Sequence, residues 1–210
     1  MARIVCFNSP RGTGKDEAAG RIHRSARHAA IVPVALAMKQ MTCERYGLPV
    51  DAWPKLDETK DTPMPLLDGK TPREAYIETR RIVEAKGAHA VWAELWTARA
   101  AELIKAGTET ILVPDCRFSN EYAAAISLVG VRDVLLAHLV REGHNTWRGD
   151  IGEWITPAEG GAEWVIINDH TLDQLHSNAM RMWRRWTDPT FEPRKTLKLA
   201  HESRAAASGG

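Results

Sequence analysis

The feature that most restricts what this chain can fold into is the segment at residues 9–16 (SPRGTGKD). Ahead of it, residues 3–9 (RIVCFNS) have the apolar and β-branched composition of a short buried strand. Behind it, apolar residues such as Ala18 and Ile22 recur at helical spacing. Where a glycine-rich turn joins a strand to a helix, backbone N–H groups and the positive end of the helix can together bind phosphate. The segment therefore predicts a phosphate-binding loop.

The residue types in this loop fit the chemistry of a nucleoside triphosphate. Gly12 and Gly14 permit close approach of the backbone, and Lys15 can neutralise charge on the β- and γ-phosphate oxygens during transfer. Two positions depart from the G-x-x-x-x-G-K-[ST] pattern, because Ser9 replaces the first glycine and Asp16 replaces the metal-binding hydroxyl. The alternative is an ordinary strand–helix turn. The nucleotide-binding residues predicted here are Ser9, Gly12, Thr13, Gly14, Lys15 and Asp16.

A second candidate group follows a clear buried-strand pattern at residues 109–114 (ETILVP). This run delivers Asp115 to its C-terminal end, where a carboxylate can hold Mg²⁺ directly or through water. Arg117 lies two positions later and can bind a phosphate bidentately. The alternatives are a capping or turn role for Asp115 and a surface ion pair for Arg117.

Cationic residues elsewhere extend the candidate site. Residues 141–161 are polar and glycine-rich, and we expect them to form a lid-like segment that closes over the transferring group and excludes water. Arg73 falls in the first turn of a predicted helix, whose N-terminus favours anions, and could bind an acceptor's phosphate. The alternatives are a solvated surface loop and a plain surface arginine. The candidate groups of the lid-like segment are Arg141, His144, Arg148 and Asp150.

Apolar patterning along the chain predicts the fold class. Strands alternate with helices, which implies an α/β protein of the three-layer P-loop NTPase fold, with a mostly parallel five-stranded sheet and helices on both faces. Capping boxes are expected at residues 71–74 (TPRE) and 171–174 (TLDQ). The strands are expected near residues 3–9, 30–34, 109–114, 133–140 and 164–167.

One domain is expected over residues 1–187, with a helical excursion at about 49–107 and a flexible tail at 188–210. The last helix carries the stretch MRMWRRW, which could be a basic aromatic patch for nucleic acid. Its apolar positions match helical spacing, which favours a core-facing helix instead. The predicted stripe consists of Leu172, Leu175, Ala179, Met182, Trp183 and Trp186.

Composition argues against several other kinds of protein. Of the 210 residues, 44% are hydrophobic and the net charge is +1, which suits a globular domain and argues against a broad nucleic-acid-binding surface. Three widely spaced cysteines give no disulfide framework or zinc signature, and eight histidines show no metal-ligand spacing. No window approaches the roughly 18 apolar residues of a membrane span. A cytoplasmic protein with no membrane partner is therefore expected.

Taken in order, the motifs resemble those of the bacteriophage deoxynucleoside monophosphate kinases. The order of the blocks is much more specific than GKD alone, and they span roughly residues 3 to 180. The blocks are the loop ending in GKD, TPREA at 71–75, GAHAVWAEL at 87–95, ILVPDCRFSNE at 111–121, VRE at 140–142 and VIINDHTLDQL at 165–175.

The resemblance implies ATP with Mg²⁺ as the phosphoryl donor and a deoxynucleoside 5′-monophosphate as the acceptor, in the synthesis of phage DNA precursors. Lys15 and the loop backbone would hold the donor phosphates, and Arg11 would contact phosphate. Asp16 and Asp115 match acidic positions near the metal and the reacting groups.

Later motifs would supply the remaining contacts. By the same resemblance, Arg73 and Arg117 would bind the acceptor, and Arg141 would begin the lid. Asn168 and Asp169 match a late N-D motif that lies where nucleotide kinases hold the adenine. The helical excursion would bind the acceptor.

Two positions depart from the family pattern. Ser9 stands for the first loop glycine, which predicts a looser loop or reduced activity, and His170 stands where glycine is usual. Two other functions stay open: a kinase that acts on a modified base in DNA or on another small phosphate acceptor, and a non-catalytic nucleotide-binding protein. The sequence does not identify the accepted base, and exposed faces of the tryptophan-rich helices could pair subunits in a homodimer.

Overall fold

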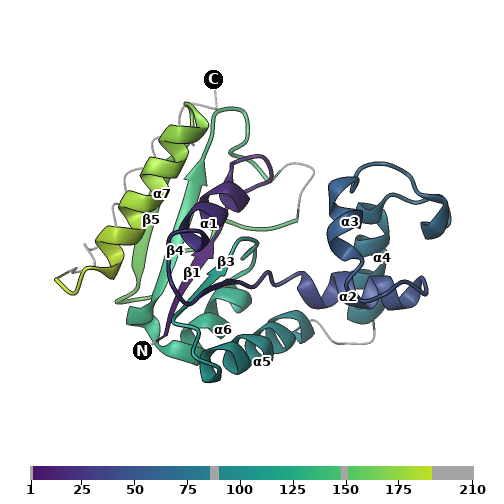
Figure 1. The fold of residues 1–210 in the computed structure, drawn as a ribbon, viewed down its shortest axis with the longest axis horizontal. Helices are drawn as coiled ribbons and strands as arrows, with labels where there is room; N and C mark the ends of the chain where they lie inside the picture. Colours follow the sequence, from purple (N-terminus) through teal and green to yellow (C-terminus); the bar gives the residue numbers. More distant parts are fainter. Residues whose placement is uncertain (1, 86–89, 148–150, 191–210) are drawn as a thin grey trace.

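A computed structural model describes residues 2–85, 90–147 and 151–190 and has an α/β architecture (Figure 1). Its strands form one sheet in the order β2-β3-β1-β4-β5, and every neighbouring pair is parallel. All five predicted strands are confirmed, and the sheet predicted to be mostly parallel is parallel throughout. The strands are β1 (Arg3–Phe7), β2 (Ala29–Ile31), β3 (Thr110–Val113), β4 (Val134–Val140) and β5 (Ala162–Ile167).

Helices cover both faces of this sheet, which is why its strands are apolar on both sides. Helices α1 (Lys15–His23) and α7 (Leu172–Thr187) pack on one face, against a cluster that includes Val5 and Leu135. Helices α5 (Val91–Lys105) and α6 (Ser119–Val129) pack on the other, against the alternate strand residues such as Leu136. A short 3₁₀ turn, η2 (Val131–Asp133), leads from α6 into β4.

A group of short helices projects beside the sheet (Figure 1). This helical unit consists of α2 (Leu36–Arg45), α3 (Trp53–Glu58), η1 (Pro65–Leu67) and α4 (Pro72–Glu84). It has a small core of its own, in which Cys43 and Leu67 are fully buried. The helical excursion was predicted at 49–107, but both of its boundaries lie earlier in the chain. The unit begins before residue 49, because α2 belongs to it, and it ends before α5, which packs through Trp96 onto the sheet.

Local helix signals in the sequence are reproduced to different degrees. The capping box at Thr71 is confirmed, since its Oγ1 accepts from the backbone N–H of Glu74, and its own N–H donates to Glu74 Oε2 at 2.8 Å. Only half of the predicted capping box forms at Thr171. Its side chain accepts from Gln174 N, but the side chain of Gln174 donates to Asn178 and not back to Thr171. The apolar stripe of α7 is buried as predicted at four positions, whereas Trp183 is half-buried and Leu172 is 53% exposed. The four are Leu175, Ala179, Met182 and Trp186.

Within the described ranges, no helix is long and apolar enough to cross a membrane. Arg148, Asp150 and residues 191–210 of the predicted tail lie outside those ranges.

Candidate functional site

The predicted site residues gather at the carboxyl edge of the sheet. The loop follows β1, Asp115 follows β3, Arg141 follows β4 and Asn168 follows β5. Strands β1 and β3 are neighbours, yet the helices that follow them, α1 and α6, pack on opposite faces. In parallel α/β sheets, such a switch point opens a crevice in which ligands bind.

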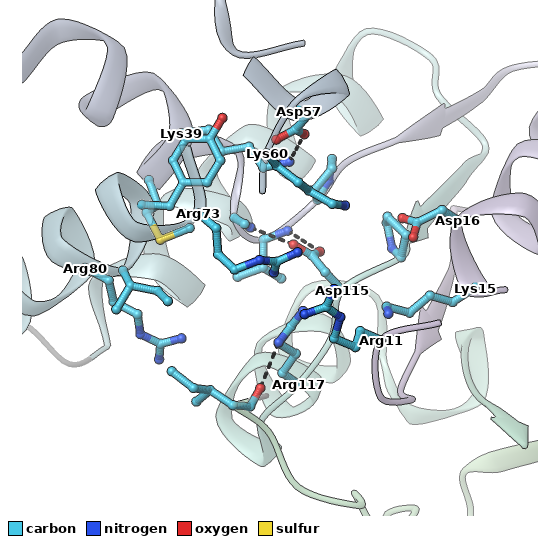
Figure 2. Close-up of a pocket in the computed structure, with 18 of the residues that line it drawn as sticks. Arg11, Lys15, Asp16, Lys39, Asp57, Lys60, Arg73, Arg80, Asp115 and Arg117 are labelled. Atoms are coloured by element: carbon cyan, nitrogen blue, oxygen red, sulfur yellow. Dashed lines mark hydrogen bonds and ion pairs between the residues drawn. The ribbon is translucent and has the colours of Figure 1, made fainter. Parts of the chain in front are cut away.

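A cavity of about 520 Å³ lies at this edge, between the loop, the helical unit and the end of β3 (Figure 2). Ser9, Thr13, Gly14, Arg141, Asn168 and Asp169 do not line it. The predicted residues that do are Arg11, Gly12, Lys15, Asp16, Arg73, Asp115, Arg117 and His144.

Glycine is required at two positions of the loop. Gly12 has a φ of +80° and Gly14 a φ of +94°, in the left-handed region that other residues rarely adopt. A Cβ on Gly12 would also lie 2.5 Å from His144 Nδ1, and one on Gly14 would lie 2.7 Å from Asn168 Nδ2. The two glycines therefore let the lid-like segment and the turn after β5 pack directly on the loop.

Side chains from other elements hold the carbonyl groups of the loop. Arg141 Nη1 donates to Gly12 O at 2.9 Å, and Asn168 Nδ2 donates to Thr13 O at 2.8 Å. Backbone N–H groups of Gly12, Thr13, Gly14 and Asp16 have no acceptor among the described residues. Arg141 and Asn168 thus act on the loop from outside the cavity, and the loop retains unused amide donors.

Lys15 opens α1 and is 5% exposed. Its Nζ donates to Pro10 O at 3.1 Å, so the ammonium is directed back over the loop. Asp16 follows in the first turn of α1, where its exposed carboxylate also favours the positive end of the helix.

Ser9 is fixed more firmly than the sequence suggested. Its Oγ accepts from the backbone N–H of Leu139 at 2.6 Å and donates to Asn8 O, so it links β1 to β4 beyond the end of β1. Its φ is not positive, and glycine is not needed there. The expectation of a looser loop at Ser9 is wrong, because the hydroxyl adds a connection that glycine lacks.

Asp115 is held by the connection between β2 and α2. Its Oδ1 accepts from Val34 N at 2.7 Å and its Oδ2 accepts from Ala35 N at 3.0 Å. Each oxygen can accept one more hydrogen bond or bind a metal, and Asp115 lines the cavity. Asp115 and Asp16 fit the small carboxylate set with which Mg²⁺ is held when phosphates and waters supply the other ligands.

Arg73 and Arg11 meet at one carboxylate. Arg73 Nε donates to Asp61 Oδ1 at 2.6 Å, and Arg11 Nη2 lies 3.8 Å from Asp61 Oδ2. Hydrogen bonding from Arg73 lowers the pKa of Asp61, with a smaller contribution from the charge of Arg11. Asp61 therefore links the loop to the first turn of α4 by occupying the cationic groups expected to bind phosphate.

Arg117 connects the end of β3 to the return arm of the lid-like segment. Its Nη1 donates to Ile151 O at 2.9 Å, and its carbonyl accepts from Glu153 N at 3.0 Å.

The side-chain amide of the buried Asn8 holds the same arm of the lid-like segment, since it donates to Glu153 O and accepts from Ile155 N. At the other end, Asp169 Oδ1 accepts from Glu142 N. Both arms of the predicted lid are thus anchored to the sheet edge.

Several cavity residues were missed by sequence reasoning, among them Glu121, Arg80 and Tyr76. Glu121 is 7% exposed, and burial raises its pKa to about 7 although amide hydrogen bonds from Arg117 and Phe118 oppose the rise. Burial, aided by Asp57, also raises the pKa of Tyr76. Only Glu121 had a usable signal, an acidic residue in the first turn of a helix that follows a strand.

Comparison of the sequence with protein-family models and with functionally characterised proteins finds no match. In the part of the chain that the structure describes, no group of three or more His, Cys, Asp or Glu side chains could hold a metal.

Proposed function

We propose that the protein is a P-loop kinase that transfers the γ-phosphoryl group of ATP to a deoxynucleoside 5′-monophosphate. The observation that carries the proposal is the loop after β1, where unused backbone N–H groups precede Lys15 at a helix N-terminus. The same cavity contains Arg11, Arg73 and Arg117, which suits two highly charged phosphate ligands. The choice of acceptor comes from the order of sequence motifs.

Little covalent chemistry would be required of the chain. The loop amides would bind the donor phosphates, and Lys15 Nζ would exchange Pro10 O for a phosphate oxygen. Arg73 and Arg117 would hold the acceptor phosphate in line with the γ-phosphorus. Such alignment makes the transfer step effectively unimolecular and so lowers its entropic cost. Asp16 and Asp115 would hold Mg²⁺, whose charge neutralises the β- and γ-oxygens when it is bound.

Lys15→Met tests this proposal in a coupled ADP-release assay with ATP and each deoxynucleoside monophosphate. Methionine keeps most of the buried stem but removes the ammonium, so we expect kcat to fall by about 10²- to 10³-fold, the cost of one lost charge-stabilising donor. Circular dichroism melting should show that the variant stays folded. Lys105→Met, at the exposed end of α5, is the matched control.

Wild-type turnover in Lys15→Met would refute the mechanism. Transfer to DNA carrying a modified base, with no transfer to free nucleotides, would favour the other phosphotransferase class. Tight ATP binding without transfer to any acceptor would favour a non-catalytic binding protein.

A further inference from the structure

We infer that Arg141 and Asn168 are positioning residues for the donor phosphates, on which they act through the loop and not by direct contact. Each side chain holds one carbonyl group of the loop, and each carbonyl fixes the direction of the N–H in the same peptide. The two N–H groups concerned belong to Thr13 and Gly14. This inference rests on the proposed donor site after β1, and it gives Asn168 a role at the phosphates instead of at the adenine.

The covalent geometry of the loop links each carbonyl group to one amide. A trans peptide is planar, so its C=O and N–H point in opposite directions. Gly12 O shares its peptide with Thr13 N, and Thr13 O shares its peptide with Gly14 N. Arg141 and Asn168 bind these two oxygens and do not line the cavity. The N–H groups of Thr13 and Gly14 are therefore directed to the other side of the loop, toward the cavity.

The two amides are donors that lack acceptors. Neither Thr13 N nor Gly14 N donates to any residue in the described ranges, and Thr13 is fully buried. A buried N–H without an acceptor is costly unless a ligand supplies one. A phosphate oxygen suits this place, because Lys15 and the N-terminus of α1 follow directly. The ligand group expected at these amides is thus a phosphate.

Asn168 is itself fixed by its surroundings. It follows β5 directly and is 9% exposed, and its backbone N–H donates to Val140 O at 2.8 Å. Its side chain packs against Gly14, where a Cβ would lie 2.7 Å from Asn168 Nδ2 and 2.8 Å from Leu175 Cδ2. Since glycine at position 14 leaves room for this approach, the amide of Asn168 reaches Thr13 O from a rigid base.

Arg141 lies on a turn that is closed around it and joined to the turn of Asn168. Its backbone N–H donates to Asn145 Oδ1 at 2.7 Å, and its carbonyl accepts from His144 N at 3.0 Å. The next residue, Glu142, donates through its N–H to Asp169 Oδ1 at 2.7 Å. The turns after β4 and β5 therefore hold each other beside the loop, and each contributes one of the two side chains that bind it.

Calorimetric titration of the full chain with ATP and with inorganic tripolyphosphate, both with Mg²⁺, tests the inference. Arg141→Met and Asn168→Leu should each raise the Kd of both ligands about tenfold, the effect of one misdirected hydrogen bond to a charged group. The ratio of the tripolyphosphate Kd to the ATP Kd should not change, because the affected contacts are to phosphate. Arg132→Met before β4 and Asn178→Leu on α7 are matched controls and should keep the wild-type Kd values.

Amide resonances provide a readout that a general weakening of the fold would not produce. In the wild type, tripolyphosphate should shift the proton resonances of Thr13 N–H and Gly14 N–H downfield, because each donates to a phosphate oxygen. Arg141→Met should abolish the shift of Thr13 alone, and Asn168→Leu should abolish that of Gly14 alone. Should Asn168→Leu fail to fold, the isosteric Asn168→Asp removes the same donor and is read by the same Gly14 resonance.

A higher Kd for ATP with an unchanged Kd for tripolyphosphate in Asn168→Leu would mean that Asn168 holds the adenine, and would overturn the inference. A Thr13 shift that survives Arg141→Met while both Kd values rise would also overturn it, because Arg141 would then bind phosphate directly. Unchanged Kd values in both variants would overturn it and leave the kinase proposal standing. Absence of binding of both ligands to the wild type would overturn the kinase proposal as well.

Discussion

Glu121 shows at the scale of one residue how burial and charge oppose each other. The unfolded chain releases this proton near the ordinary carboxyl pKa, but burial delays its release in the native protein to about pH 7. The stability that Glu121 contributes is therefore complete at low pH and lost as the pH rises through 7. Glu121 therefore lowers the stability of the folded protein at neutral pH, which is consistent with a role in binding a ligand in the cavity that it lines.

Glu121→Gln should consequently gain stability relative to the wild type as the pH rises. The amide keeps an oxygen to accept from Arg117 and Phe118 but carries no charge, so its advantage should be larger at pH 8 than at pH 5. The pKa shift corresponds to at most about 3 kcal/mol. Urea denaturation followed by circular dichroism at both pH values measures the difference. An equal difference at pH 5 and pH 8, or the same trend in the exposed control Glu159→Gln, would contradict it.

Residue identities in the loop were predictable from the sequence, but their partners were not. Spacing alone identified Gly12, Gly14 and Lys15, because the strand, turn and helix that place them are local. The hydrogen bonds of Asp115 to Val34 and Ala35 join residues about 80 positions apart. No local pattern encodes such pairings, since they follow from how the elements dock.

At the scale of elements, Asp61 joins the helical unit to the loop through Arg73 and Arg11. The phosphate of the proposed acceptor would compete with this carboxylate for the donors of either arginine. Asp61 is 56% exposed, so the competing ion pairs contribute little free energy and can be exchanged readily. The carboxylate would thus keep the two arginines in place before the acceptor binds.

Asp61→Asn should therefore lower the KM for the acceptor about two- to fivefold, the range that loss of an exposed ion pair allows. Steady-state assays at saturating ATP measure this KM. Asp68→Asn removes one charge from the same helical unit away from the cavity, and asparagine tolerates its φ of +56°. A higher acceptor KM in Asp61→Asn than in Asp68→Asn would show that Asp61 positions Arg73 instead of competing with phosphate.

Strands and helices themselves were largely predictable, because apolar periodicity and the Thr71 cap are short-range signals. The order of the strands in the sheet could not be predicted from the sequence, and neither could the position of α5. The spacing of its tryptophans predicts an apolar face but not the surface on which that face packs. The structure shows that Trp96 packs on the sheet and donates to Val32 O. The boundary of the helical unit therefore had to come from the structure.

At the scale of the whole molecule, the cavity lies between two bodies with separate cores, the sheet with its covering helices and the helical unit. A ligand that reaches from the loop to Arg80 would touch both. One that occupies a single end would leave their relative position to the contacts of the unliganded protein, which include the packing of Met38 against both cores and the exposed ion pairs of Asp61. Ligand length should then control stability as strongly as ligand charge.

A dinucleoside pentaphosphate that links adenosine to deoxythymidine should raise Tm more than dTMP or a non-hydrolysable ATP analogue at the same concentration. At a hundred times its Kd it should add about 2.7 kcal/mol, or roughly 5–10 °C for a chain of this size. Differential scanning calorimetry measures the shift. Lys15→Met and Arg80→Met should each reduce it to the value of a one-ended ligand, because each removes a contact at one end. Equal shifts for the linked compound and for the better of its halves would mean that the loop and the Arg80 end do not belong to one continuous site.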